Sequence, residues 1–171
     1  DDNSVVVASR SALLQRDGDV VATDGFSPIT FSLGAGGYHI AIRHRNHLGA
    51  MTADTARFRS GVTQADLTLL STSLYGSQAQ KQVGARCVLW AGDVTFDNVV
   101  QYVGASNDRD PILVAIGGST PTATTSGYHN ADVNLDGRVK YVGMSNDRDP
   151  ILVNIGGSTP TNIREGQLPQ P

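Results

Sequence analysis

The stretch that decides the fold is a run of 30 residues that occurs twice. The second copy reads DVNLDGRVKYVGMSNDRDPILVNIGGSTPT at 132–161, and the first reads DVTFDNVVQYVGASNDRDPILVAIGGSTPT at 93–122. The copies align without gaps at an offset of 39 residues, and 23 of the 30 positions are identical. Identity at this level indicates a duplicated structural unit, which we expect to fold in the same way twice.

The second copy begins with the pattern of a calcium-binding loop. The EF-hand loop supplies side-chain oxygens from positions 1, 3 and 5 and a backbone carbonyl from position 7, with Gly at position 6. Asp132, Asn134 and Asp136 occupy the three side-chain positions, and Gly137 follows them. We therefore expect a calcium ion to be held by these side chains and by the carbonyl of Arg138.

The ligand that closes this loop lies beyond the usual position. Position 12 is Gly143, which has no carboxylate, so we expect a longer loop that Asp147 or Asp149 closes. Asp149 is favoured because Pro150 suits the first position of a helix, which would make Asp149 the N-cap. We expect that helix to end at the glycine pair 156–157.

The first copy predicts a second and weaker calcium site. Asn98 stands where the glycine is expected, and Asn adopts the left-handed backbone more readily than most residues. A hydrophilic turn without a metal is the alternative, but two copies with the same NDRDPIL downstream favour calcium. The candidate ligands of this loop are Asp93, Thr95, Asp97, the carbonyl of Val99, and Asp108 or Asp110.

Residues 1–91 have a different pattern, in which short β-favouring runs alternate with turns rich in Gly and Asp. This pattern predicts a mainly β chain that starts with an antiparallel β-sandwich, immunoglobulin-like or transthyretin-like. We expect domains at 1–91 and 92–165, the latter being the pair of calcium loop–helix repeats, and a tail at 166–171. The expected strands lie at 5–7, 20–22, 29–31, 38–42, 56–59, 65–70 and 82–90.

Composition and motifs argue against several functions. The net charge is −3, and the longest cluster of basic residues is the pair Arg43 and Arg45 on either side of His44. We therefore expect no nucleic-acid partner. No apolar run approaches the roughly 18 residues of a membrane span. The single Cys87 lies in an apolar run typical of a core thiol. No catalytic motif is present and calcium accounts for the Asp pairs, so we expect no enzyme.

The segment 43–47, Arg-His-Arg-Asn-His, is dense in histidine, and His39 lies nearby. A metal or glycan site is one interpretation. Structural hydrogen bonding is favoured, because successive residues of a strand face opposite sides and these side chains would not all converge.

The chain resembles a known family. DVNLDG at 132–137 followed by NDRDPIL at 146–152 resembles the dockerin-like C-terminal modules of large secreted bacterial surface proteins, often labelled hemagglutinin- or adhesin-like. The segment GYHIAIRHRNHLG at 37–49 resembles the β-sandwich that precedes such modules. The resemblance implies calcium-bound, non-catalytic modules that are secreted or lie on the bacterial surface. Thr95 and Asn98 depart from the pattern and weaken the expected first site.

These features predict an extracellular calcium-stabilised structural or adhesion module that mediates protein–protein assembly. The expected partner is the chain itself, as in a self-assembling surface fibre, with residues 4–9 able to add a strand to a neighbour or to pair within their own sheet. A dockerin that binds a cohesin-like receptor and a glycan-binding β-sandwich are the alternatives. Thr55 and the STPT turns at 119–122 and 158–161 are candidate sites for O-glycans.

Overall fold

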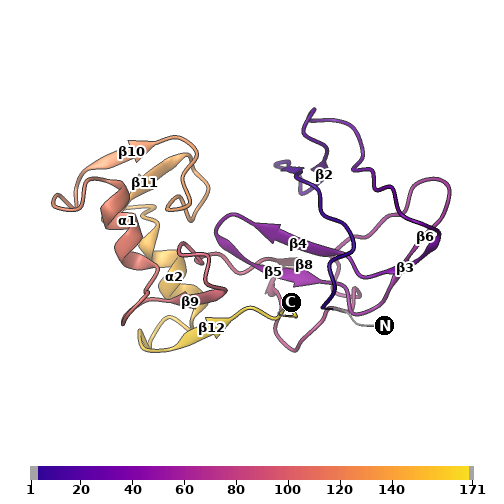
Figure 1. The fold of residues 1–171 in the computed structure, drawn as a ribbon. Helices are drawn as coiled ribbons and strands as arrows, with labels where there is room; N and C mark the ends of the chain where they lie inside the picture. The colour runs from indigo at the N-terminus through magenta and orange to yellow at the C-terminus, as the bar shows by residue number, and fades with distance from the viewer. Residues whose placement is uncertain (1–3, 170–171) are drawn as a thin grey trace. The chain divides into compact units, whose positions relative to one another are not determined.

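The structure is a computed structural model that describes residues 4–169. Within that range it contains twelve short strands and two helices of seven residues each (Figure 1). The prediction of a mainly β chain is therefore confirmed. The predicted sandwich stays a prediction, because the described strands pair only two by two.

All six strand pairs are antiparallel. They are β1–β2, β3–β6, β4–β5, β7–β8, β9–β12 and β10–β11. The strands are β1 (Leu13–Leu14), β2 (Val20–Val21), β3 (Gly36–Tyr38), β4 (Ala41–His44), β5 (His47–Met51), β6 (Ala56–Phe58), β7 (Lys81–Val83), β8 (Arg86–Val88), β9 (Val99–Gln101), β10 (Thr124–Ser126), β11 (Arg138–Lys140) and β12 (Ile163–Glu165). The helices are α1 (Arg109–Ala115) and α2 (Arg148–Asn154).

Two compact units divide the chain. The first comprises 1–39, 55–65 and 169–171, and the second comprises 40–54 and 66–168. Residue 91, where the domain boundary was expected, lies inside the second unit, so residues 40–54 and 66–91 belong to the same unit as the duplicated segment.

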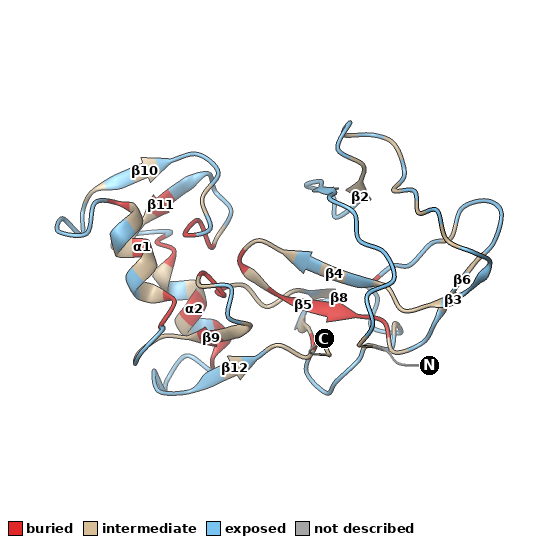
Figure 2. Cartoon of the chain, in the orientation of Figure 1, coloured by how far each residue is buried: buried red, intermediate tan, exposed pale blue. Residues whose placement is uncertain are grey.

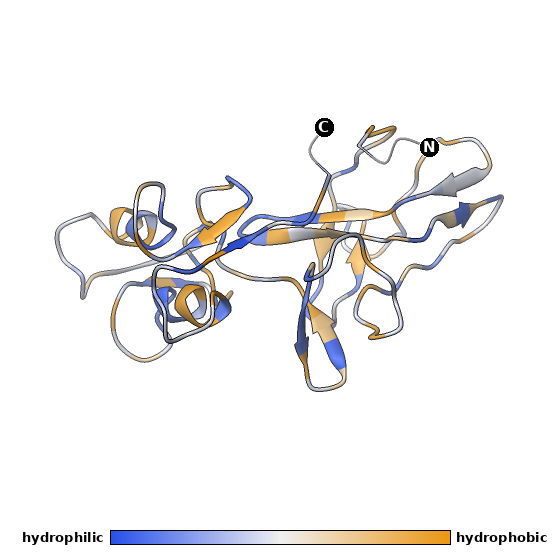
Figure 3. Cartoon of the chain, turned by 90° about the horizontal axis from the view of Figure 1, so that it is seen from below, coloured by the Kyte–Doolittle hydropathy of each residue, from blue (hydrophilic) through white to orange (hydrophobic). Residues whose placement is uncertain are grey.

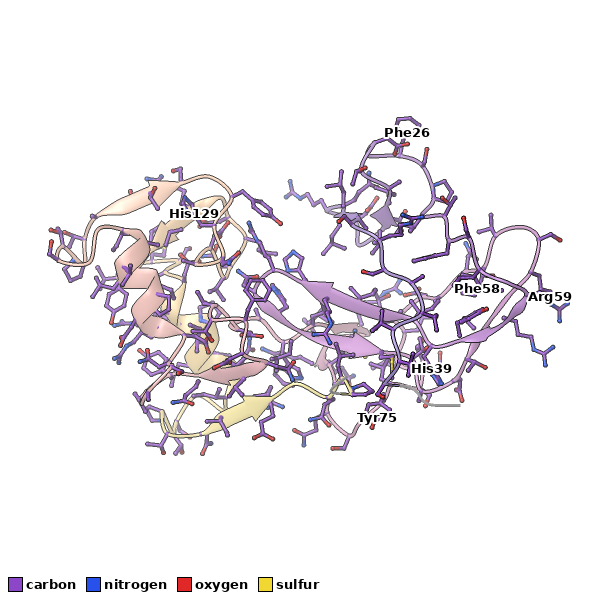
Figure 4. All side chains as sticks on the ribbon, in the orientation of Figure 1. Phe26, His39, Phe58, Arg59, Tyr75 and His129 are labelled. Atoms are coloured by element: carbon purple, nitrogen blue, oxygen red, sulfur yellow. The ribbon has the colours of Figure 1, made fainter. Side chains whose placement is uncertain are left out.

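Aromatic rings pack against each other in the first unit. The ring of Phe58, labelled in Figure 4, lies edge-on to Phe31 and Tyr38, with centroids 6.2 and 5.3 Å apart. By contrast, Phe26 is 78% exposed. Few large side chains are buried in this unit, and the aromatic cluster packs Phe31 and the β3–β6 ribbon together.

Several strand predictions were wrong. Residues 5–7, 29–31 and 65–70 form no strand, and the run 82–90 contains a turn at Gly84 that separates β7 from β8. Strand β5, with the sequence HLGAM, was not predicted. Strand formation depends on packing and on a partner strand more than on intrinsic preference, and β5 is buried along most of its length (Figure 2).

The main core belongs to the second unit and consists largely of equivalent residues from the two copies. Ile112 and Ile151, at the same position of α1 and α2, are both fully buried. Both helices carry apolar and polar residues on their surfaces (Figure 3), and each contributes one buried isoleucine to this core. The core residues are Leu48, Val94, Val100, Ile112, Ile116, Ala131, Val133, Val139, Ile151 and Ile155.

The two copies exchange their last strands. β9 of the first loop pairs with β12, which follows α2, and β11 of the second loop pairs with β10, which follows α1. The registers are equivalent, since Ile163 pairs with Gln101 and Thr124 pairs with Lys140. Each copy thus completes the other, so both are needed to form the ribbons of the pair.

Helix α2 is followed by the glycine pair 156–157, as predicted, and α1 is followed by the equivalent pair 117–118. Gly157 donates its N–H to the carbonyl of Leu152 at 2.9 Å, and Gly156 donates to Val153 at 3.2 Å. Both glycines have positive φ, 118° and 79°. This is the Schellman arrangement that satisfies the last carbonyls of a helix.

Leu168 in the predicted tail is buried, with 6% exposure. Its side chain fills the space beside Gly49 of β5, where an added Cβ would meet it. Residues 170 and 171 of the predicted tail, like residues 1–3 of the predicted first domain, lie outside the described residues.

Candidate calcium loops

The second loop is wrapped around the side chain of Asp132, which is 2% exposed. The Asp132 carboxylate accepts the N–H groups of Asp136 and Gly137, each at 3.1 Å. The side chain of Asn134 also accepts the Asp136 N–H, at 2.9 Å, and Asp136 accepts the N–H of Arg138 at 2.9 Å. Backbone N–H groups therefore orient the oxygen side chains that the sequence singled out in this loop.

The two loops share one backbone conformation. Leu135 and Gly137 have φ of 61° and 83°, and the equivalent Phe96 and Asn98 have φ of 61° and 67°. Asn98 thus adopts the left-handed conformation for which glycine was expected. Holding three non-glycine residues in this region costs free energy, of order 1 kcal/mol or more each, which the rest of the loop must offset.

The first loop repeats the arrangement around Asp93, which is 4% exposed. Its carboxylate accepts the N–H groups of Asp97 at 3.1 Å and Asn98 at 3.2 Å, and Asp97 accepts the N–H of Val99 at 3.0 Å. Burial, followed by the charge of Asp97, raises the pKa of Asp93. A cation between these two carboxylates would offset both effects.

Asp108 and Asp147 brace the loops from within the structure. Asp147 is fully buried; its Oδ1 accepts the N–H groups of Val133 at 2.7 Å and Asn134 at 3.1 Å, and its Oδ2 accepts that of Lys140 at 2.8 Å. Each buried carboxylate thus ties the start of its loop to the strand that follows. The matching donors to Asp108 are the N–H groups of Val94, Thr95 and Gln101 and the hydroxyl of Thr95.

Burial raises the pKa of Asp108 to about 6, opposed by the N–H donors of Gln101, Thr95 and Val94. Because donors approach both oxygens, the arrangement requires the ionised carboxylate. This bracing role was missed from the sequence, where Asp108 and Asp147 were considered only as closing ligands of calcium. An ionised carboxylate has about four acceptor positions, so the ligand role stays a prediction.

The prediction that Asp149 is an N-cap was wrong. Helix α2 begins at Arg148, so Asp149 lies in its first turn. The side chain of Asn146 accepts the Asp149 N–H at 3.0 Å and donates to its Oδ2 at 2.8 Å. Asn107 and Asp110 make the same reciprocal pair in the first copy. The Asn-x-x-Asp spacing, which resembles a capping box, was the signal available in the sequence.

The donor set suits a hard cation. Among residues 4–169, no three side chains of His, Cys, Asp or Glu are grouped as a metal site. The candidate set of each loop combines three carboxylates, counting the closing one, with an amide or hydroxyl and a backbone carbonyl, all of them oxygen donors. Calcium accepts such mixed oxygen ligands, whereas zinc in proteins usually takes His nitrogen or Cys sulfur as well.

Asn46 connects both loops to the β4–β5 hairpin and was not singled out as a site residue. Its side chain, with 0% exposure, donates to the carbonyl of Asn130 at 2.8 Å and to that of Asp132 at 2.7 Å. Its own carbonyl accepts the N–H of Gly92, directly before the first loop, at 2.8 Å. Structural hydrogen bonding by the segment 43–47 is therefore confirmed.

No protein-family model matches the chain, and neither does any curated protein or solved structure. In the part of the chain that the structure describes, no helix is long and apolar enough to cross a membrane.

Proposed function

We propose that this chain is an extracellular calcium-stabilised structural or adhesion module whose duplicated loops bind two calcium ions. One observation carries the proposal: each loop wraps its backbone around a buried aspartate in the same conformation. The aspartates are Asp93 and Asp132, and the N–H groups at positions 5 and 6 point at each of them. Duplication of such a loop, with oxygen donors retained in both copies, favours a shared ligand over a simple turn.

Calcium would stabilise a fold that has little else to hold it. The core of the paired copies is small, and the loops bury carboxylates at a cost in solvation. A cation that binds only the folded loops adds its binding free energy to the free energy of unfolding. Sites with dissociation constants of about 10⁻⁴–10⁻³ M are filled where calcium is millimolar, which supports a secreted or bacterial cell-surface location.

The better ligand set belongs to the second loop, which we propose as the tighter site. Asn134 offers an amide oxygen where Thr95 offers a hydroxyl, and that hydroxyl donates to Asp108 at 3.1 Å. Asp149 and Asp110 are the proposed closing ligands, with Asp147 and Asp108 as the alternatives. The dockerin-like character of the pair and the β-sandwich of residues 1–91 belong to the same proposal.

Calorimetric titration of the full chain with calcium tests this proposal. Asp136→Asn and Asp97→Asn are suitable variants, because both residues are exposed and Asn keeps an oxygen that can accept the loop N–H. The wild type should bind two ions, and each variant should lose one. Asp19→Asn, in an exposed turn of the other unit, is the matched control and should keep both ions. Absence of binding heat in the wild type would refute the proposal.

Self-association is the proposed mode of assembly. Val5, Val6 and Val7 are 61, 73 and 61% exposed and lie outside the strands, which supports strand addition to a second copy by the segment that contains them. The described strands pair only two by two, and an unpaired strand edge can accept a strand from a second copy. The exposed STPT turns at 119–122 and 158–161 remain candidate sites for O-glycans.

A cohesin-like receptor is the second candidate partner. Val114 and Val153 occupy the same position of α1 and α2 and are 71 and 57% exposed, which gives a symmetric pair of apolar contacts. Glycan binding has less support, because the ring of Trp90 lies under the guanidinium of Arg164 at 3.6 Å.

A further inference from the structure

Arg45 at the tip of the β4–β5 hairpin contacts the central carboxylate of the second loop. Its Nη2 lies 3.4 Å from Oδ2 of Asp132, and the two side chains are 11 and 2% exposed. The guanidinium also lies 4.0 Å from the ring centroid of Tyr128. Its Nε and Nη1 are buried without a hydrogen-bond partner, so Asp132 is the one polar group that this ion contacts within the described chain.

The first loop lacks this contact. Within residues 4–169, Asp93 forms no ion pair. The two loops share backbone conformation and most of their sequence, so the presence of Arg45 is a clear difference between them. The second loop, which has the better calcium ligands, is the one whose central aspartate pairs with a positively charged side chain.

We propose that Arg45 is a built-in counter-ion of the second loop, which holds Asp132 in the absence of calcium and competes with calcium for it. This inference rests on the proposed function of the loops. Asp132 is the first ligand of the second loop, and calcium placed beside its carboxylate would be repelled by the guanidinium. The second loop therefore binds calcium less tightly than its ligand set alone predicts, and it stays folded when calcium is low.

The β4–β5 hairpin stays attached to the second loop through contacts other than that of Arg45. Asn46, the next residue, holds the backbone of the second loop through two hydrogen bonds to carbonyls, at 2.7 and 2.8 Å. The neighbouring Leu48 is 1% exposed, and its N–H donates to the carbonyl of Trp90 at 2.8 Å. The backbone of the tip is therefore fixed, so the proposed release moves the Arg45 side chain and not the hairpin.

The test is calcium affinity of the second loop in full-length chains that carry Asp97→Asn to remove the first site. Arg45→Gln keeps much of the side-chain length and removes the charge. A guanidinium and a calcium ion about 5 Å apart in water repel each other enough to weaken calcium binding roughly tenfold. Arg45→Gln should therefore tighten calcium binding by about that factor or more. Without calcium, the same variant should melt at a lower temperature, because Asp132 loses its counter-ion. Arg43→Gln, which is exposed on the same hairpin, should leave both the affinity and the melting temperature unchanged.

Three outcomes are decisive. Calcium binding that becomes tighter in Arg45→Gln but not in Arg43→Gln supports competition between Arg45 and calcium. Calcium binding that is unchanged or weaker in Arg45→Gln overturns the competition and leaves the calcium proposal standing. Absence of calcium binding in both chains refutes the proposed function and the competition together.

A measurement on the wild type keeps the inference testable if Arg45→Gln does not fold. In a nuclear magnetic resonance titration, the Nε–H signal of Arg45 should shift with the same midpoint as the amide signal of Gly137. An Arg45 signal that stays fixed while Gly137 saturates would overturn the competition.

Discussion

Replacement of Asp147 by Asn removes a charge and one acceptor from the interior of the second copy. Asp147 is fully buried, and its two oxygens accept three backbone N–H groups at 2.7 to 3.1 Å. Asn has nearly the same shape, so no cavity forms. Its Oδ1 can keep the bonds from Val133 and Asn134, but its Nδ2 faces the N–H of Lys140, which then has no acceptor.

The expected loss is about 3 kcal/mol in the free energy of unfolding. A buried donor without a partner costs about 1–3 kcal/mol, and hydrogen bonds to a charged acceptor are worth roughly 1 kcal/mol more each than neutral ones. Relief from burying the charge recovers part of this sum, because burial raises the pKa of Asp147.

Urea unfolding in chelator and in excess calcium measures this loss. We expect the same decrease under both conditions, because the bonds that Asp147 accepts do not involve a metal. Asp149→Asn is the control: Asp149 is exposed and bonds mainly to Asn146, so its loss should stay below about 1 kcal/mol without calcium. If Asp147→Asn were as stable as the wild type in chelator and less stable only in calcium, Asp147 would be a ligand and not a brace.

Two further predictions concern pH and assembly. Burial, and after it the charges of His44 and Arg45, lowers the pKa of His47 to about 3. Below about pH 6.5, the ordinary pKa of histidine, the unfolded chain therefore binds more protons than the folded chain. The contribution of His47 to the free energy of unfolding is complete above about pH 6.5 and should fall by up to about 1.4 kcal/mol per pH unit towards pH 3. Urea unfolding should show that His47→Gln reduces this slope. Equal slopes in the variant and the wild type would refute the role given to His47. Val6→Asp should abolish the concentration-dependent assembly that sedimentation measures. Val62→Asp, at a similarly exposed valine, should leave that assembly unchanged. Assembly that survives Val6→Asp would exclude strand addition by residues 4–9.

The local parts of the fold were predictable from the sequence. The duplication, the left-handed positions at Gly137 and Asn98, and the helix end at the glycine pair 156–157 all follow from residues close together in the chain. Helix α2 nevertheless starts at Arg148 and not at Pro150, because Asn146 caps the turn through its side chain. Prolines inside the first turn do not fix which residue begins a helix.

The long-range parts could not be predicted. Pairing of β9 with β12 and burial of the HLGAM strand β5 both depend on segments far away in the sequence. Asp147 was identified as an acidic residue, but local spacing does not reveal that backbone N–H groups surround both of its oxygens. Arg45 contacts a carboxylate 87 residues away, so the counter-ion of the second loop has no local signature.

The most direct test of calcium stabilisation is the melting temperature of the full chain, measured in chelator and in excess calcium. The wild type and a double variant that carries Asp97→Asn and Asp136→Asn should be compared side by side. We expect calcium to raise the melting temperature of the wild type and to leave that of the double variant unchanged. An equal rise in both chains, or no rise in the wild type, would contradict the account that these two loops bind calcium and stabilise the fold.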